Sequence, residues 1–523
     1  MFDSTKNTIK RHRQIRDVYN RLRDDDKLNL IESIKIEITE YYSRNQKFSL
    51  QGLNDQICSK AFAQFFFIRI LNKNFNYNIY KSLKSSKPFA YPIPSDIDFI
   101  LKKNGLKINY FRCRILWKTK QLEFFLRGLR RGVLNVIDFF KSKKSIIKSS
   151  NSKMFFSLGI NNFPKKTVNN NYGIFNNAFL KSNNISSDFF HESKHFKNFY
   201  KSEKFNLRYL PNHLIYNLKP FELLKFFAQF LYDSIIFFLK LMFCKSDDLI
   251  LFEELVNYRL ASNKSFFFDE YLFNNSNVLY RPLWSYIAEK NKSLISHYFY
   301  STNIERFKIN DDNFDSDPFC WKFSTWQKFY FWDQFQLNFF KSKLNYSFKY
   351  KIVGPTLFNF TSLIKSLNFK KNTILIFDVQ PVRITYYREL AFGQEYYVRD
   401  NCIKFINDIC YSANKIGFKV VIKRKRNIGN MIDYIYLNNI KKLINNNLLS
   451  EVDPNIPAEF LLKSCENVIC MPFTSVAIFA NNLSKNVSYY DSTSKIAKDD
   501  NASHGVKILS NNAELNNWIK NIK

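Results

Sequence analysis

The stretch NTILIFDV, at Asn372–Val379, decides the fold class. Its apolar run Ile374–Phe377 is continuous rather than alternating, which is the pattern of a strand buried on both faces of a parallel sheet. Asp378 and Gln380 follow at once. Open parallel sheets bind their ligands just beyond the carboxyl ends of the strands. The stretch therefore predicts both a buried strand and the side of the sheet on which chemistry should be sought.

Downstream of this strand, segments of helical and strand type alternate to the end of the chain. Repeated alternation predicts a doubly wound parallel sheet, here a C-terminal α/β domain over residues 351–523. The expected helices are 396–415, 431–444, 457–464, 475–483 and 513–522, and the expected further strands are 418–422, 467–471, 486–490 and 506–509.

Upstream, weaker patterns divide the rest of the chain. Residues 246–350 contain strand and helix patterns that predict a first α/β domain. Residues 151–245 read as an Asn-rich insertion or linker followed by an amphipathic apolar helix. Residues 1–150 are basic and largely helical in pattern. The predicted fold class is α/β, with two Rossmann-like domains after a mostly helical, basic N-terminal region.

The chain is strongly basic, with 79 Lys and Arg against 45 Asp and Glu and a net charge of +34. Such a balance attracts polyanions, which include nucleic acids, anionic lipid surfaces and phosphorylated sugars. An A+T-rich coding bias is the alternative cause, since it enriches Lys without any binding role. The strongest local cluster lies at 102–148, where apolar residues recur at helical spacing. This segment predicts a cationic helix that is either a solvated face or a docking face for anionic lipid or a phosphate-bearing acceptor.

Two features of the sequence bear on whether the protein is cytoplasmic or spans a membrane. The eight cysteines lack CxxC pairs and no apolar leader follows the basic N-terminus, which together predict a cytoplasmic protein. Pro220–Cys244 is nearly long enough to span a bilayer, but it carries Glu222, Lys225, Asp233 and Lys240. Each Asp or Lys costs about 2.5 to 3.5 kcal/mol at mid-membrane. We therefore expect a buried core helix or a helix lying at the membrane surface.

The most informative site motif is Met-Pro-Phe-Thr-Ser-Val-Ala, which begins at Met471. Pro472 turns the chain out of a strand, and Thr474 and Ser475 fall where a helix begins. Hydroxyls beside free backbone N–H groups at a helix start form an anion site, which suits a phosphate. The alternative is that Thr474 merely caps its own helix.

Charged residues at other strand ends complete the predicted site. Lys423 and Arg424 follow the strand 418–422 and would neutralise a departing phosphate, unless they are solvated surface. Asp378 and Glu305 are the candidate catalytic bases. Arg281 is a candidate contact to donor or acceptor, with a structural role as the alternative. Because no DxD pair follows a buried strand, we expect a site with no metal and no cofactor.

Five motifs together resemble a known family. They are Tyr280–Tyr286 (YRPLWSY), His297–Asn303 (HYFYSTN), Lys351–Pro355 (KIVGP), Val420–Arg426 (VVIKRKR) and Met471–Ala477 (MPFTSVA). In these motifs the chain is similar to the bacterial polysaccharide-biosynthesis proteins named for their PFTS motif. That group is similar to two-domain glycosyltransferases of the GT-B type and, distantly, to bacterial sialyl- and polysialyltransferases.

The resemblance implies a metal-independent glycosyltransferase of surface polysaccharide synthesis, of capsule or lipopolysaccharide O-antigen type. It implies that Thr474 and Ser475, with Pro472, hold the phosphate of a nucleotide-sugar, and that Lys423 or Arg424 stands near it. A CMP-linked donor is one option, although those transferases carry a His-Pro pair where this chain has Lys-Arg. The nucleotide-sugar would then bind residues 351–523, and the acceptor would bind residues 246–350.

The implied partners are the nucleotide-sugar donor, a lipid-linked or polysaccharide acceptor and an anionic membrane surface, with no nucleic acid. Such a protein would be cytoplasmic, with peripheral attachment to the inner face of the cell membrane as the alternative. Two other functions remain open on the sequence. They are a non-catalytic polysaccharide-assembly factor and a nucleic-acid-binding protein.

Overall fold

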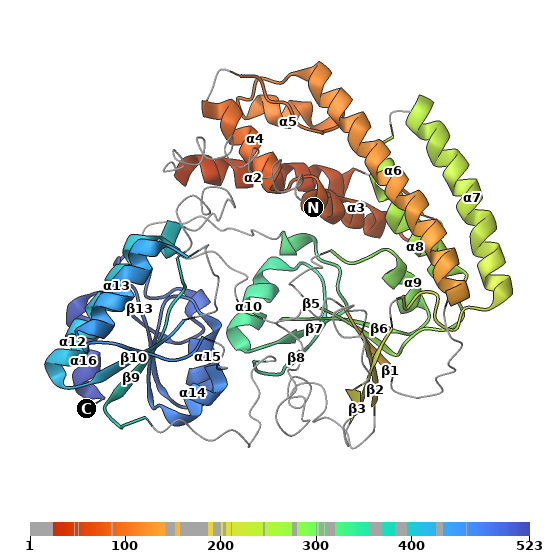
Figure 1. Ribbon diagram of the computed structural model, residues 1–523. Helices are drawn as coiled ribbons and strands as arrows, with labels where there is room; N and C mark the ends of the chain where they lie inside the picture. Colours follow the sequence, from red (N-terminus) through yellow and green to blue (C-terminus); the bar gives the residue numbers. More distant parts are fainter. Residues whose placement is uncertain are drawn as a thin grey trace.

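The computed structural model shows two parallel sheets and a set of N-terminal helices (Figure 1). The second sheet and its helices form one lobe, while the long helices α6 and α7 lie at the opposite edge of the molecule. The structure describes residues 25–45, 48–50, 52–84, 87–141, 152–156, 187–191, 200–201, 205–210, 212–243, 246–274, 280–299, 301–302, 308, 320–355, 369–381, 395–424, 432–454, 456 and 458–522.

The second sheet is a six-stranded parallel sheet of the order β11-β10-β9-β12-β13-β14. The chain runs outward from β9 to β11, returns to the other side of β9, and then runs outward again to β14. The order therefore reverses between β9 and β12, and such a switch point is where open α/β sheets bind ligands. The strands are β9 (Thr373–Phe377), β10 (Lys419–Lys423), β11 (Ser450–Glu451), β12 (Asn467–Cys470), β13 (Asn486–Tyr490) and β14 (Lys507–Leu509).

Helices connect these strands in the predicted alternation. Each helix and strand predicted after residue 372 is confirmed to within a few residues. The edge strand β11 was not predicted, because its two residues carry no periodicity. The helices are α12 (Arg399–Ile416), α13 (Tyr434–Asn445), α14 (Ala458–Ser464), α15 (Ser475–Asn482) and α16 (Asn512–Asn521).

The first sheet has eight strands in the order β3-β4-β2-β1-β5-β6-β7-β8. Every pairing is parallel except that of β3 with β4, and the order reverses between β1 and β5. The two predicted Rossmann-like domains are confirmed. The strands are β1 (Ser152–Phe155), β2 (Ser187–His191), β3 (Tyr200–Lys201), β4 (Phe205–Tyr209), β5 (Glu270–Asn274), β6 (Leu294–Tyr298), β7 (Lys328–Phe331) and β8 (Lys349–Ile352), and the helices are α8 (Phe252–Ser262), α9 (Trp284–Lys290) and α10 (Gln334–Lys343).

Two predicted domain boundaries need correction. The segment 151–245, expected to contain an insertion or linker, supplies strands β1 to β4 of the first sheet. Met154 and Phe155 of β1 are buried, but a strand this short between Asn-rich segments cannot be recognised from the sequence pattern. The predicted boundary at 350/351 cuts through β8, which pairs with β7. The first domain therefore begins at β1 and extends through β8.

The N-terminal region is helical where the structure describes it, as predicted. α6 and α7 run side by side, with α8 beside them (Figure 1). The helices of this region are α2 (Asp25–Arg44), α3 (Asp55–Arg69), α4 (Lys73–Lys84), α5 (Asp98–Lys103) and α6 (Tyr110–Lys141), and α7 (Pro220–Phe243) joins them from between β4 and β5. Single 3-10 turns occur at η1 (Ser95–Ile97), η3 (Asp247–Leu251), η4 (Trp321–Phe323), η5 (Glu395–Tyr397) and η7 (Asn501–Ser503).

Two glycines of α6 allow its neighbours to approach closely. A Cβ at Gly132 would overlap the ring of Phe230 on α7, and a Cβ at Gly128 would overlap the ring of Phe252 on α8. A larger residue at either position would push its neighbour outward. The glycines therefore fix how α7 and α8 lie against α6.

Gly132→Leu is expected to lower the free energy of unfolding of the protein by about 3 kcal/mol, because overpacking of a close contact costs roughly 1 to 3 kcal/mol or more. Val133→Leu is the matched control, since Val133 is exposed on the same helix. Chemical denaturation of the two variants checks this. Equal stabilities would contradict the close packing of α7 on α6.

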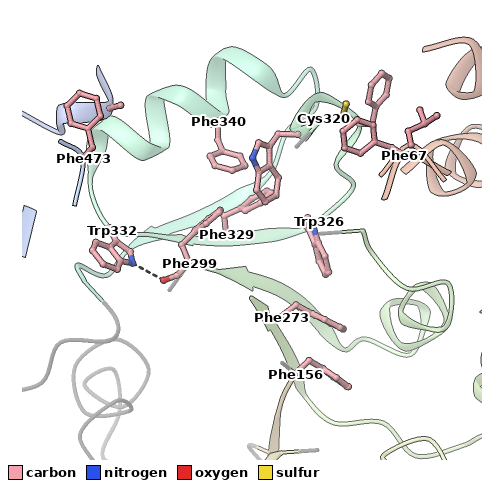
Figure 2. Close-up of a cluster of buried hydrophobic side chains, with 14 of the residues drawn as sticks. Phe67, Phe156, Phe273, Phe299, Cys320, Trp326, Phe329, Trp332, Phe340 and Phe473 are labelled. Atoms are coloured by element: carbon pink, nitrogen blue, oxygen red, sulfur yellow. Dashed lines mark hydrogen bonds between the residues drawn. The ribbon is translucent and has the colours of Figure 1, made fainter. Parts of the chain in front are cut away.

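A cluster of buried aromatic side chains fills the first domain and reaches the second (Figure 2). It extends from Phe67 on α3, through Phe273 on β5 and Phe329 on β7, to Phe473 in the second domain. The indole N–H of Trp332 donates to the carbonyl of Phe299 at 2.8 Å. The apolar core is thus continuous across the junction of the two domains, and Phe473 belongs to the PFTS motif.

Candidate functional site

The ends of four strands of the second sheet lie level with one another. The register places Lys423 of β10 and Cys470 of β12 on either side of Phe377 of β9, and Cys470 opposite Tyr489 of β13. With about 4.8 Å between neighbouring strands, Lys423 and Cys470 are roughly 10 Å apart. The predicted common edge for the cationic residues and the PFTS motif is confirmed. Its centre is the switch point between β9 and β12.

The turn from β12 into α15 is held by three hydrogen bonds. The N–H of Phe473 donates to the hydroxyl of Tyr397 at 3.0 Å, and the N–H of Thr474 donates to the carbonyl of Met471 at 3.1 Å. The hydroxyl of Tyr489 donates to the carbonyl of Thr474 at 3.0 Å. These contacts fix the start of α15 directly above the switch point, with Pro472 buried in the turn.

The first turn of α15 has polar groups available to a ligand. Thr474 is the N-cap residue, but its side chain makes no capping bond, so the alternative that it merely caps its helix is wrong. Thr474 is only 8% exposed, and its hydroxyl has no hydrogen-bond partner among the described residues other than the thiol of Cys470. The N–H groups of Ser475 and Val476 likewise make no backbone hydrogen bond there. Backbone donors of this kind at a helix start favour an anion.

The thiol beside this hydroxyl is neutral. Burial raises the pKa of Cys470 to about 12, and the nearby hydroxyl of Thr474 moderates the rise. Cys470 therefore places no negative charge under the first turn of α15. The local charge at this helix start is set by the backbone dipoles, whose positive end points toward the first domain's hydroxyl groups.

Ser475 meets the first domain. Its hydroxyl oxygen lies 3.2 Å from Oγ of Ser301 and 3.4 Å from Oγ1 of Thr302. Ser301 and Thr302 follow β6, so they lie at the carboxyl edge of the first sheet. The carboxyl edges of the two sheets therefore face each other at Ser475. Ser301 and Thr302 were not among the predicted site residues, although both lie in the motif His297–Asn303.

Further contacts join the two edges. Nδ1 of His504 lies 2.7 Å from Oδ2 of Asp333, which begins α10 after β7. The N–H of Lys308 donates to Asp500 at 2.7 Å, and the N–H of Ala497 donates to the carbonyl of Lys308 at 2.9 Å. Polar contacts from several loops thus hold the domains together around the hydroxyl cluster.

His504→Ala should loosen this junction, because it removes a buried contact with Asp333 and a ring beside Phe335. We expect a larger radius of gyration by small-angle X-ray scattering, with unchanged secondary structure by circular dichroism. Asp499→Asn is the control, since its pair with Lys308 is exposed and such pairs contribute little. Identical scattering from both variants would contradict a structural role for the His504–Asp333 contact.

Asp378 lies at the switch point, immediately after β9. It is 2% exposed, and burial raises its pKa to about 6, while the hydroxyl of Tyr436 and the charges of Arg424 and Lys423 moderate the rise. Tyr436 donates to Oδ2, and Oδ1 has no hydrogen-bond partner among the described residues. A buried carboxylate with one unsatisfied oxygen and a pKa near neutrality has the properties of a general base.

Lys423 and Arg424 are engaged with the protein. Nζ of Lys423 donates to the carbonyls of Arg424 and Pro454, each at 3.1 Å. Arg424 forms an ion pair with Glu451 of β11. The alternative that they are merely solvated surface is wrong for Lys423, which is 7% exposed. Their charges act on Asp378, and direct contact with a phosphate would require them to exchange these partners.

The two remaining predicted site residues are elsewhere or not described. Arg281 is buried, where it forms an ion pair with Glu289, donates to the carbonyl of Thr325 at 2.8 Å and lies over the ring of Tyr286. Thr325 precedes β7, so these contacts lie toward the amino edge of the first sheet and indicate the structural alternative. Glu305 lies outside the described residues.

The fold and the site together define a two-domain, doubly wound α/β protein whose candidate site lies where the carboxyl edges of its sheets meet. The chain belongs to the family of polysaccharide biosynthesis PFTS motif proteins, whose family model matches residues 237–519. The resemblance seen in the sequence is thereby confirmed. The matched region contains α15 and every other element placed at the junction.

Solved structures with similarity to this chain include three with named ligands or activities. The first belongs to a study of glycosyl transfer with retention by trehalose-6-phosphate synthase, with 12% identity over 71% of this chain and 94% of that one, at a TM-score of 0.33. The second is Glycyrrhiza uralensis UGT73P12 with glycyrrhetinic acid 3-O-monoglucuronide. It is 9% identical over 71% of this chain and 86% of its own chain, with a TM-score of 0.34. The third is Methanocaldococcus jannaschii UDP-GlcNAc 2-epimerase with UDP-GlcNAc and UDP. It is 11% identical over 71% of this chain and 92% of its own chain, with a TM-score of 0.33. Among curated protein sequences, none matches this chain.

Proposed function

We propose that this protein is a glycosyltransferase of polysaccharide synthesis, which transfers a sugar from a nucleotide-activated donor to a glycan acceptor at the junction of its two domains. One observation carries the proposal. The start of α15 lies at the switch point of the second sheet, and its Ser475 hydroxyl meets Ser301 and Thr302 of the first domain. A donor bound there would lie between two α/β domains, where donor and acceptor can be held together.

The donor phosphate would bind at the first turn of α15. The N–H groups of Ser475 and Val476 and the buried hydroxyl of Thr474 are the donors available to its oxygens, and the hydroxyl of Ser475 would exchange its contacts with Ser301 and Thr302 for the phosphate. A helix N-terminus also presents about half a positive charge. Lys423 and Arg424, two strands away, add positive potential that would stabilise the departing phosphate without touching it.

Asp378 would act as the catalytic base. In this mechanism its carboxylate takes the proton of an acceptor hydroxyl, and that oxygen forms a bond to the anomeric carbon of the donor sugar. The bond between the anomeric carbon and the phosphate oxygen breaks, and the nucleotide leaves with the electron pair. With a pKa of about 6, Asp378 is mostly ionised at pH 7 and is a stronger base than an exposed Asp.

The finer parts of the proposal rest on the family resemblance of the sequence motifs. The product would be a surface polysaccharide of capsule or O-antigen type, and the acceptor would be a lipid-linked or polysaccharide chain in the cytoplasm. A CMP-linked donor is the first to test. A non-catalytic assembly factor would retain the junction without turnover, and the buried, partly unsatisfied Asp378 argues against it because such a group costs stability.

A panel of CMP-, UDP- and GDP-sugars tests the proposal. Thermal unfolding of the purified protein with each nucleotide-sugar should show a rise in Tm for at least one donor, since a ligand at 100 times its Kd stabilises by about 2.7 kcal/mol. Release of the free nucleotide in the presence of glycan acceptors then measures turnover. Failure of every donor to raise Tm would contradict the proposal. Binding without turnover would favour the assembly factor, and salt-dependent binding of nucleic acid alone would favour the third function.

A further inference from the structure

α7 turns one stripe of side chains toward the protein. The stripe recurs every three or four residues, as expected for one side of a helix. Phe230 of this stripe lies against Gly132 of α6, and the ring of Phe237 stacks on Phe252 of α8 at 4.7 Å. The buried members are Leu223, Phe226, Phe230, Asp233 and Phe237.

The opposite side of α7 is apolar and exposed. At 100° per residue its large apolar side chains fall on one continuous face, roughly 160° wide and centred opposite the buried stripe. Phe243 is 80% exposed and Leu224 is 64% exposed. Soluble proteins rarely expose so large an apolar patch without a partner. The exposed members are Phe221, Leu224, Phe227, Leu231, Tyr232, Ile235, Phe238, Leu239, Met242 and Phe243.

α6 extends this surface. The two helices lie side by side, with the rings of Phe125 and Phe238 6.3 Å apart and Nζ of Lys118 donating to the carbonyl of Leu241 at 3.1 Å. Next to the side that contacts α7, α6 carries a second exposed stripe at helical spacing. We call the two exposed stripes together the α6–α7 face. The members on α6 are Phe111, Ile115, Leu122, Leu126, Val133, Ile137 and Phe140.

A row of positive charge borders the α6–α7 face. Arg112, Arg130 and Lys141 are exposed and follow one another on the side of α6 away from α7, whereas Arg127 on the same side pairs with Glu123. Apolar side chains next to Lys and Arg are the composition of helices that lie in the interface of an anionic bilayer. A protein partner would have to supply an equally long apolar surface with an acidic border, whereas an anionic membrane offers both features on any plane.

The ion pairs of α7 indicate that it lies on the membrane rather than across it. α7 is long and apolar enough to span a bilayer by length and composition, and only 22% of its most apolar window is buried. However, Asp233 pairs with Arg259 of α8 at 2.8 Å, and Lys240 pairs with Asp248 at 2.6 Å. A spanning α7 would have to leave α6 and α8 and carry Asp233 into hydrocarbon without its partner, which is costly.

We propose that the α6–α7 face is a membrane-docking surface, which inserts its apolar side chains into the interfacial layer of an anionic bilayer while α7 remains packed on α6 and α8. Arg112, Arg130 and Lys141 contact the lipid phosphates at the border of the face. α7 stands between β4 and β5 in the chain, so docking would hold the first domain at the membrane surface.

Flotation of the full-length protein with vesicles tests the proposal. We expect binding to vesicles of phosphatidylcholine with about one third phosphatidylglycerol, and at least about tenfold weaker binding to phosphatidylcholine alone. Leu224→Glu with Ile235→Glu should abolish binding to both. The matched control is Tyr350→Glu with Tyr411→Glu, which adds the same charge at exposed rings elsewhere and should bind as the wild type does. Arg112→Ser with Arg130→Ser and Lys141→Ser should remove the preference for the anionic lipid.

Two results would overturn the proposal. One is wild-type protein that stays with the aqueous fraction for both kinds of vesicle. The other is a homodimer by size-exclusion chromatography with light scattering that Leu224→Glu and Ile235→Glu convert to monomers, together with vesicle binding that is equal in wild type and variant. That result would assign the face to a second copy of the chain. Circular dichroism of the variants confirms that they fold.

Discussion

Asp378→Asn is expected to lower kcat by at least about 100-fold while making the protein more stable at pH 8. The loss of rate follows because Asn cannot accept a proton, and general-base catalysis contributes roughly 10² to 10⁴-fold. The gain in stability follows because burial raises the pKa of Asp378 to about 6. The fold thus favours the protonated carboxyl, so its stabilising contribution is present below about pH 4 and is lost as the pH rises through 6.

Asn resembles the protonated carboxyl at every pH, so this loss does not occur in the variant. About two pKa units correspond to roughly 3 kcal/mol at pH 8, and the difference from wild type should vanish near pH 4. Chemical denaturation at both pH values measures it. Asp491→Asn is the control, because Asp491 is buried with its carboxylate accepting N–H bonds from Thr493 and Ile496, and its loss should destabilise the protein. An Asp378→Asn variant that is less stable than wild type at pH 8 would contradict the argument that burial of the ionised carboxylate destabilises the fold.

The pH dependence of kcat separates a catalytic role from a structural one. Activity should fall as the pH is lowered through about 6, where Asp378 becomes protonated. Tyr436→Phe removes the hydroxyl that stabilises the ionised carboxylate, so it should move this acid limb to higher pH. An acid limb that is the same in wild type and Tyr436→Phe would assign it to another group.

Thr474→Ala together with Ser475→Ala is expected to weaken nucleotide-sugar binding by about 100-fold. Hydrogen bonds to a charged phosphate contribute roughly 1.5 to 3 kcal/mol each, and two hydroxyls are removed. The fold should be little affected, because the Thr474 hydroxyl makes no capping bond and its partner among the described residues is the neutral thiol of Cys470. Isothermal titration calorimetry with the donor found in the screen measures the change.

A matched pair of substitutions distinguishes this effect from general loss of polar groups. Ser488→Ala with Ser510→Ala removes two buried hydroxyls of the same domain that also lack partners among the described residues, and it should leave Kd unchanged. Ser301→Ala with Thr302→Ala removes the first-domain side of the hydroxyl cluster and should weaken binding less. If both control pairs weaken binding as much as Thr474→Ala and Ser475→Ala, the phosphate is not bound at α15.

The C-terminal domain was predictable because its central strands, β9 and β12, are fully buried and most residues of β10, β13 and β14 are buried too. A run such as Ile374–Phe377 needs two covered faces, and helices on both sides of the sheet supply them. The same reasoning placed Thr474 and Asp378 at one edge. The sequence pattern could not predict the order of the strands, because pairing between distant segments leaves no local pattern. It therefore could not show that β9 and β12 are neighbours.

The first domain was harder to predict. β1 is only four residues long between Asn-rich segments, and its burial depends on pairing with β2 and β5. The partners of Arg281 and Lys423 could not be predicted from the sequence either, because only the fold brings Glu289 and the carbonyl of Pro454 next to them. Charge and position in the sequence predicted ligand contacts where the structure shows internal ones.

The proposed docking surface and the proposed reaction fit one arrangement of the molecule. A first domain held at the membrane would meet an acceptor that is attached to lipid, while the second domain holds the donor at α15. The two proposals rest on separate residues, so failure of one leaves the other standing. The α6–α7 face can bind vesicles in a protein without transferase activity, and the junction can bind a donor in a protein that stays soluble.

A crystal structure with the nucleotide of the preferred donor tests the central claim most directly. The account predicts a phosphate within hydrogen-bond distance of the N–H of Ser475 and the hydroxyl of Thr474, between the carboxyl edges of the two sheets. A phosphate bound at any other place, with the hydroxyl of Ser475 still in contact with Ser301 and Thr302, would contradict it.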